Sequence, residues 1–348
     1  MGIIKIPDRS IDFFKDNIDE IFNSGNLSEG IWNKKISDYV KHLTGAKSAL
    51  TTNSNGAGLV GLMSLYRHYY KRKYVMIQNN TMYGVKTMII ASGCSQIGFI
   101  NSQINTLMPS FKDVKSSISK LNKNQKNKLI ILLSHIGGIL NPDILNIASL
   151  CKKENIILLE DCAHSFASTL NNKHSGLFGD AGVYSFYATK AIPVGEGGVV
   201  ITKNKKIGEM ISKFSIYDRF DQKLELGNNI RISEIQALMS YSVIKEWKEI
   251  IENKEIVAKK YIKICNQKNI KYIDQRKNGH FGNYYKFVIY DDKFPISKIT
   301  PNLKTKTSPV YDYDIGTKNL VSKHHECLPI WYGQKNNITT KVCKEILM

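Results

Sequence analysis

Two runs of large aliphatic residues in the middle of the chain constrain its fold most strongly. LIILLS at 129–134 and IILLE at 156–160 are almost continuously apolar, as strands buried on both faces are. Between them, Pro142 and Asp143 open a helical stretch that runs through Lys153. The three segments predict a βαβ unit, and therefore an α/β fold with a mostly parallel sheet covered by helices.

Helical and strand-like segments alternate along the rest of the chain, and the pattern changes near residue 240. From Ser233 to about Cys265 the sequence is helical, as one long helix or two. A strand-like run, YYKFVIY at 284–290, and a polar tail follow. We expect a large domain over 1–240 and a smaller α+β domain over 241–348. Further helices are expected over 11–23, 31–45 and 57–69, and strands over 48–52, 182–186 and 199–202.

The charge balance does not predict a nucleic-acid partner. The 348 residues include 49 Lys+Arg and 30 Asp+Glu, which gives a net charge of +19. Only six of the basic residues are arginine, the side chain that binds bases and phosphates in bidentate fashion. The basic runs at 71–73 and 123–128 are short and lack the interleaved aromatic residues of a nucleic-acid groove.

Targeting and metal signals are missing from the sequence as well. No run of 18 apolar residues and no signal-peptide pattern occurs, so we expect a cytoplasmic protein with no membrane partner. We expect no metal, because the cysteines lack metal-ligand spacing. The six are Cys94, Cys151, Cys162, Cys265, Cys327 and Cys343.

One stretch can supply each group that pyridoxal phosphate requires. Asp161 follows a buried strand, where open α/β sheets bind ligands, and its carboxylate would keep the pyridine nitrogen protonated. Lys190 would form the Schiff base, and Ser185 would reach the phosphate. His164 would contact the ring or its hydroxyl.

A second stretch predicts an anion site at the start of a helix. TNSNGAG at 52–58 reads as a strand, a turn and a helix start, and we expect Asn55, Gly56 and Ala57 to hold the cofactor phosphate there. An ordinary Asn/Gly turn with a capping side chain is the alternative.

These residues together resemble the DegT/DnrJ/StrS family of nucleotide-sugar aminotransferases, which depend on pyridoxal phosphate. EDCAHSFAS at 160–168, GLFGDAGVYSFYATKAIPVGEGGVVIT at 176–202 and GNNIRISEIQA at 227–237 carry the resemblance. It implies an aspartate-aminotransferase-like fold (fold type I) with a seven-stranded type of sheet, and a homodimer with active sites at the interface. It also implies that Asn229 reaches the phosphate of the partner subunit's cofactor.

Three departures from the family pattern are visible. Ala57 stands where the family usually has threonine, and Met82 stands where an aromatic ring normally stacks on the cofactor. Either Met82 packs there or Tyr83 replaces it. The C-terminal half is short and divergent.

The resemblance implies transfer of an amino group from L-glutamate to a keto-6-deoxyhexose on a nucleoside diphosphate, through a Lys190 aldimine and a pyridoxamine form. The GEGG at 195–198 favours the 4-keto position, with dTDP-4-keto-6-deoxyglucose first. The alternatives are a GDP-linked 4-aminotransferase, a 3-aminotransferase and a sugar dehydratase, in which histidine replaces the lysine. A binding protein on an inactive aminotransferase scaffold is the non-enzymatic alternative. Candidate substrate residues are Tyr83, His135, Arg231, His324 and His325.

Overall fold

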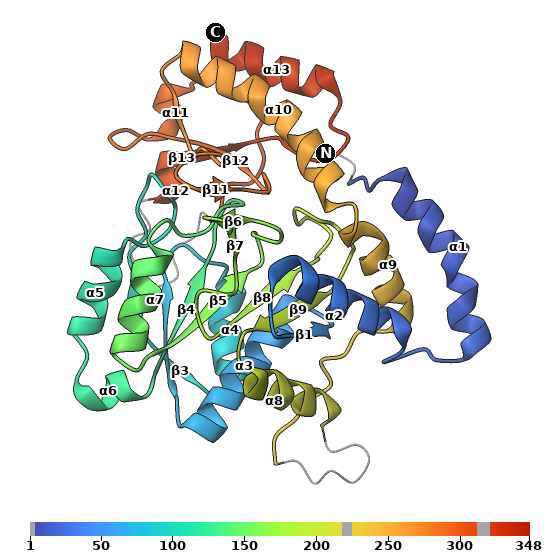
Figure 1. Ribbon diagram of the computed structural model, residues 1–348. Helices are drawn as coiled ribbons and strands as arrows, with labels where there is room; N and C mark the ends of the chain where they lie inside the picture. The colour runs from blue at the N-terminus through green and yellow to red at the C-terminus, as the bar shows by residue number, and fades with distance from the viewer. Residues whose placement is uncertain (1–3, 218–224, 312–320) are drawn as a thin grey trace.

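The central feature of the computed structural model is a seven-stranded sheet in the order β1-β9-β8-β5-β4-β2-β3 (Figure 1). The structure describes residues 4–217, 225–311 and 321–348. The run β3, β2, β4, β5 and β8 is parallel, whereas β9 is antiparallel to both β8 and β1. The predicted mostly parallel α/β sheet is therefore confirmed. The strands are β1 Ser48–Thr52, β2 Tyr74–Gln78, β3 Ser95–Ile100, β4 Leu129–Ser134, β5 Ile157–Cys162, β8 Ala181–Ser185 and β9 Gly198–Thr202.

Helices cover both faces of this sheet because its central strands carry apolar side chains on both faces. In β4, Ile130 and Leu132 face the cluster formed with α3, α4 and α8, whereas Ile131 and Leu133 face α5 and α7. Each such buried side chain contributes about 1.5–3 kcal/mol. The helices of this domain are α1 Asp8–Ser24, α2 Ile31–Thr44, α3 Asn55–Tyr70, α4 Tyr83–Ala91, α5 Phe111–Ser119, α6 Lys123–Asn127, α7 Ile144–Lys153, α8 Lys205–Ile216 and α9 Glu234–Ile244.

The C-terminal part forms a second, smaller α+β layer. A three-stranded antiparallel sheet, β10-β12-β13, packs with α10 and α13, which Figure 1 shows at the end of the molecule opposite α8. Its elements are β10 Lys271–Tyr272, β12 Phe287–Tyr290, β13 His325–Leu328, α10 Trp247–Gln267, α11 Ile296–Ile299, α12 Val321–His324 and α13 Asn336–Leu347.

The two parts share one hydrophobic core. Trp32 of α2 and Tyr261 of α10 belong to the same buried cluster. A small sheet joins the parts too, because β11 (His280–Phe281) pairs with β6 (Thr169–Leu170), which in turn pairs with β7 (Lys173–His174). The predicted boundary at residue 240 falls within α9, and the nearest helix break is at Lys245 and Glu246.

No helix of the described residues is both long enough and apolar enough to cross a membrane.

Candidate active site

Asp161 lies at the carboxyl end of β5, where three groups orient its carboxylate. The Asn55 side chain and the Ala163 N–H donate to Oδ1, each at 3.1 Å, and the Ser134 hydroxyl donates to Oδ2 at 3.1 Å. Ser134 comes from the end of β4 and Asn55 from the start of α3. Because Asp161 is only 7% exposed, its carboxylate is fixed in direction and reachable from one side.

Glu160, its neighbour in β5, points to the opposite face of the sheet and is fully buried. Its Oε1 accepts from the N–H groups of Phe178 and Gly179, both at 2.7 Å, and its Oε2 from the Gly176 N–H at 2.8 Å. Burial alone would raise the pKa of Glu160, but the bond from His135 and these backbone bonds hold that pKa below its usual value. Glu160 thereby anchors the loop between β5 and β8.

His135, a predicted substrate residue, is engaged within the protein. His135 is buried, its Nε2 lies 2.8 Å from the Glu160 carboxylate, and its Nδ1 accepts the Asn141 N–H at 3.0 Å. Both ring nitrogens are therefore engaged inside the protein. Cys162 lies close to these two side chains, and all three are residue types that can bind a metal. The Glu160 carboxylate, however, already accepts hydrogen bonds from within the protein.

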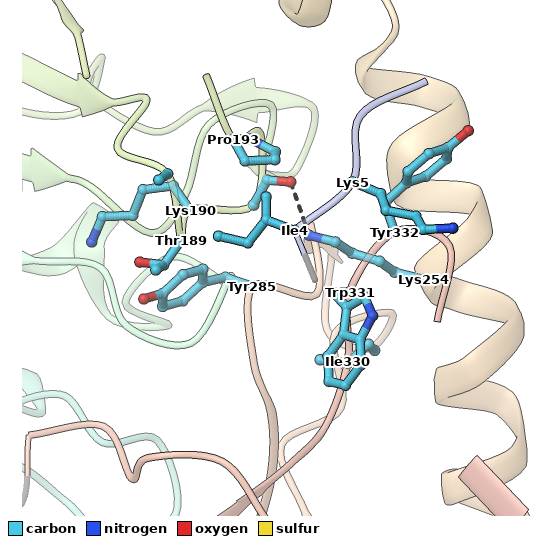
Figure 2. Close-up of a pocket in the computed structure, with 12 residues that line it drawn as sticks. Ile4, Lys5, Thr189, Lys190, Pro193, Lys254, Tyr285, Ile330, Trp331 and Tyr332 are labelled. Carbon is cyan, nitrogen blue, oxygen red and sulfur yellow. Dashed lines mark hydrogen bonds between the residues drawn. The ribbon is translucent and has the colours of Figure 1, made fainter. Parts of the chain in front are cut away.

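Lys190 lies in the loop that follows β8, with its side chain half-buried. Burial lowers the pKa of its ammonium, Asp161 raises it, and Lys286 lowers it further, with a net value of about 8. The next residue, Ala191, is held from the small domain, because the buried Lys254 of α10 donates to its carbonyl at 2.9 Å (Figure 2). The backbone next to Lys190 is thus held in place, and the Lys190 amine has a lowered proton affinity.

Glycines allow the chain around Lys190 to turn and pack closely. Gly195 and Gly197 have φ values of 130° and 138°, which side-chain-bearing residues rarely adopt. A Cβ on Gly198 would lie 2.8 Å from the backbone of Ser54 and Asn55. The GEGG segment is therefore needed to bring the β9 start against the turn before α3.

His164 lies on the same side as Lys190 and is supported by two tyrosines. Its ring stacks on Tyr285 with centroids 4.1 Å apart, and the Tyr311 hydroxyl lies 3.1 Å from its Nε2. Burial, Lys190 and Lys286 together hold its pKa well below the usual value. Among the described residues its Nδ1 has no hydrogen-bond partner although it is buried, so a neutral imidazole presents one nitrogen to a ligand.

The turn before α3 differs from the expectation in two respects. The Ser54 hydroxyl accepts the Ala57 N–H at 3.1 Å as an N-cap, so this N–H does not serve an anion. The Asn55 side chain points to Asp161 instead of toward the turn. Gly56 at the helix start and the buried Ser185 at the end of β8 remain candidates for the phosphate.

Met82 and Tyr83 begin α4, and both are substantially exposed, at 39% and 53%. The Met82 side chain folds over Gly84, where a Cβ would lie 2.8 Å from its terminal methyl group. Their contact with a cofactor ring stays a prediction.

Asn229 is exposed beside the turn, where Asn53 donates to the carbonyls of Asn229 and Ile230 at 3.5 and 2.7 Å. Arg231 is engaged within its own chain. Its guanidinium donates to the Ser215 carbonyl and lies 3.5 Å from the Glu29 carboxylate. A substrate contact by Arg231 stays a prediction.

The adjacent histidines, which were predicted as substrate residues, form hydrogen bonds within the chain. His325 is buried in β13, where its Nε2 accepts the Val310 N–H at 2.8 Å and its Nδ1 lies 2.5 Å from the Val321 carbonyl. The Nδ1 of His324 lies 2.8 Å from the Asp291 carbonyl. Neither lines the cavities beside Lys190 that the described residues form.

The sequence did not identify the small-domain side of the site. A cavity of about 520 Å³ lies against His164 and Thr189. Its small-domain lining includes Tyr285, Lys286, Tyr311 and Trp331. A strand-like run at 284–290 was visible in the sequence, but no motif distinguished its first residues as site residues. Asn55 and Ser134 were likewise not recognised as partners of Asp161.

The described residues fit pyridoxal phosphate. Asp161 is an oriented carboxylate for a pyridinium nitrogen, Lys190 is a lysine with lowered pKa, and the His164 Nδ1 is a buried polar atom without a partner among the described residues. The buried Ser185 and the start of α3 are the candidates to hold the phosphate, because a helix N-terminus is suited to bind one.

The comparisons with known proteins agree with this fit. Residues 9–307 match the model of the DegT/DnrJ/EryC1/StrS aminotransferase family. A Helicobacter pylori UDP-4-amino-4,6-dideoxy-N-acetyl-beta-L-altrosamine transaminase is 26% identical over 70% of this chain and 65% of its own length. A GDP-perosamine synthase of Escherichia coli O157:H7 is 25% identical over 80% of this chain and 76% of its own.

A solved structure supports the fold over the full length. The Helicobacter pylori aminotransferase PseC superposes with a TM-score of 0.81 at 21% identity, covering 99% of this chain and 96% of that one. With a family match over most of its residues, the chain belongs to the DegT/DnrJ/EryC1/StrS aminotransferase family, whose aminotransferases depend on pyridoxal phosphate.

Proposed function

We propose that the chain transfers an amino group from L-glutamate to the 4-keto position of a 6-deoxyhexose carried on a nucleoside diphosphate. The observation that carries the proposal is the placement of Lys190 beside an oriented Asp161 and a buried, neutral His164. Bound pyridoxal phosphate supplies an electron-withdrawing ring that accepts the electron pair left when a proton leaves the substrate carbon.

Lys190 is suited to move that proton. With a pKa of about 8, about a tenth of its amines are neutral at pH 7, whereas an ordinary lysine with a pKa near 10.4 is almost entirely charged. The neutral amine would take the proton from the α-carbon of the amino donor and pass it to the bound cofactor, and in the second half of the cycle it would move a proton from the cofactor to the acceptor carbon. Asp161 favours a protonated pyridine ring because its carboxylate is held in place by three donors.

The acceptor is inferred from the relatives. The Helicobacter pylori relative is named for a UDP-linked 4-amino-4,6-dideoxy sugar, and the Escherichia coli relative for GDP-perosamine. The first name supports the 4-keto position for this chain. We propose dTDP-4-keto-6-deoxyglucose as the first acceptor, giving dTDP-4-amino-4,6-dideoxyglucose, and a GDP-linked 4-keto-6-deoxyhexose as the second, which the similarity to GDP-perosamine synthase favours.

A panel of nucleotide sugars tests this proposal. The purified protein is loaded with pyridoxal phosphate and incubated with ¹⁵N-labelled glutamate and dTDP-, GDP- or UDP-linked 3-keto and 4-keto sugars. We expect ¹⁵N on carbon 4 of the product, detected by mass and NMR. Loss of an oxygen without gain of nitrogen would identify a dehydratase, and label on carbon 3 would identify a 3-aminotransferase. No cofactor binding would favour a binding protein.

We also propose a homodimer in which Asn229 serves the partner's site, because Asn229 is exposed beside the turn before α3. Mixed dimers test this directly. Lys190→Ala and Asn229→Ala chains are each impaired alone, but a mixed dimer has one site with both residues intact if Asn229 acts across the interface. Recovered activity on mixing supports the proposal, and its absence in verified mixed dimers would refute it.

A further inference from the structure

Lys286 is a half-buried cation of the small domain, and no acidic side chain of the described residues pairs with it. Its ammonium lies 3.2 Å from the Ser308 carbonyl and 3.5 Å from the Thr307 hydroxyl. No carboxylate of residues 4–217, 225–311 and 321–348 lies within ion-pair distance of it. Most buried or partly buried charges in proteins are paired, so this one is available for an anion.

The position of Lys286 relates it to the reacting amine. The ammonium groups of Lys190 and Lys286 lie 5.3 and 5.6 Å from the centroid of one ring, that of Tyr285. Lys286 acts electrostatically on both Lys190 and His164. The 520 Å³ cavity is lined by His164, Tyr285 and Lys286 among others. It therefore places the Lys286 ammonium near the side chains that surround Lys190.

The lining of this cavity suits a small anion. Tyr285, Tyr311 and Trp331 give it aromatic walls, and Lys286 with the Thr307 hydroxyl forms its polar end. One ammonium and one hydroxyl can bind the single charge of a carboxylate, whereas a diphosphate carries at least two charges and usually requires several donors. Two lysines near one ring repel each other, and a bound carboxylate relieves that repulsion.

We propose that Lys286 binds a carboxylate of the amino donor. This inference rests on the proposed transfer from glutamate and assigns a residue to that step. It differs from the cofactor contacts, since Lys286 comes from the segment preceding β12 and lines the 520 Å³ cavity together with His164.

Binding and single-turnover measurements on the cofactor-loaded protein test the assignment. In Lys286→Met we expect the dissociation constant of glutarate, an unreactive dicarboxylate, to rise about 10- to 100-fold by calorimetry, as the loss of a charge-assisted contact predicts. The glutamate concentration that half-saturates the bleaching of the visible cofactor band should rise by a similar factor. Lys286→Arg, which keeps the charge, should recover most of the glutarate affinity.

Matched controls separate the local contact from the general positive field. Lys323→Met removes an exposed lysine of the same domain and should change glutarate binding less than 2-fold. L-Glutamine identifies the carboxylate: if only glutamate weakens in Lys286→Met, Lys286 binds the side-chain carboxylate, and if both donors weaken, it binds the α-carboxylate.

Two results would overturn the assignment. One is unchanged glutarate and glutamate affinity in a folded Lys286→Met protein, and the other is weakening of the nucleotide sugar alone. Failure of the proposed function would give a different result. The wild-type protein would still bind glutarate through Lys286 but would aminate no sugar, which would refute the transfer and leave the Lys286 assignment standing.

Discussion

The two walls of the site differ in how firmly their charged groups are held. On the large-domain wall, Asp161 accepts three hydrogen bonds, and Glu160, buried behind that wall on the opposite face of the sheet, accepts four, all from within the chain. On the small-domain wall, Lys286 contacts only a hydroxyl and a carbonyl, at 3.5 and 3.2 Å. The charges of the large domain are therefore fixed by the fold, whereas the Lys286 ammonium has few contacts, as the proposed donor site requires.

Substitution of Lys190 should have the largest effect, because the large-domain wall has no other amine at this position. In Lys190→Ala we expect amine transfer to fall by at least about 10⁴-fold, since both covalent attachment and proton transfer are lost. Single-turnover loss of the visible cofactor band measures it. A decrease below 10-fold would mean that the large-domain wall does not provide the reacting base.

Glu160→Gln tests whether the large-domain wall depends on its buried charge. The substituted amide leaves the His135 ring and at least one loop N–H with a poorer acceptor, so we expect unfolding free energy to fall by about 3 kcal/mol. Urea unfolding monitored by fluorescence measures it, with Glu154→Gln on the partly exposed C-cap of α7 as control. A change under about 1 kcal/mol would show that the carboxylate is not the anchor inferred above.

Lys254 connects the two walls, and its titration gives a pH dependence. Burial lowers its pKa to about 7, whereas in the unfolded chain it is about 10.4. Between these values the unfolded chain retains a proton that the folded chain has released, so stability should rise with pH from about 7 to 10, by at most about 1.4 kcal/mol per unit.

The pH dependence is best measured by comparing Lys254→Met with wild type. Below pH 7 both states of wild type are protonated and the contribution of Lys254 to the slope disappears. The variant should lose part of the rise above pH 7 in urea unfolding of the cofactor-free protein. Parallel curves for the two proteins from pH 6 to 10 would contradict a buried, titrating Lys254.

Tyr311→Phe should have the smallest effect. It keeps the aromatic wall but removes the hydroxyl 3.1 Å from the His164 Nε2. A neutral hydrogen bond is worth about 1 kcal/mol, so we expect the transfer rate to fall about 5-fold. A loss above 100-fold in the same assay would mean that the small-domain wall takes a direct part in the chemistry.

The large-domain wall was largely predictable from the sequence because its groups lie at or shortly after strand ends. The apolar runs at 129–134 and 156–160 place Asp161 at the carboxyl end of a buried strand. The residues that follow, up to Lys190, carry the family pattern. Local sequence therefore determined both the position and the chemical type of these groups.

The remaining parts depend on tertiary packing that local sequence does not encode. His135 and His325 look like candidate ligands, but their buried ring nitrogens serve the fold. The break between α9 and α10 carries neither proline nor glycine. Lys286 lines the cavity only because β12 packs beside the large domain, and no sequence motif predicts that contact.

Borohydride trapping tests the central claim most directly. The cofactor-loaded protein is reduced, digested and mapped by mass spectrometry, with Lys254 as an internal comparison because it too is buried with a lowered pKa. The account predicts the phosphopyridoxyl mass on Lys190 and on no other lysine, with loss of the visible band. An adduct on Lys254 or Lys286, or none at all after incubation with pyridoxal phosphate, would contradict it.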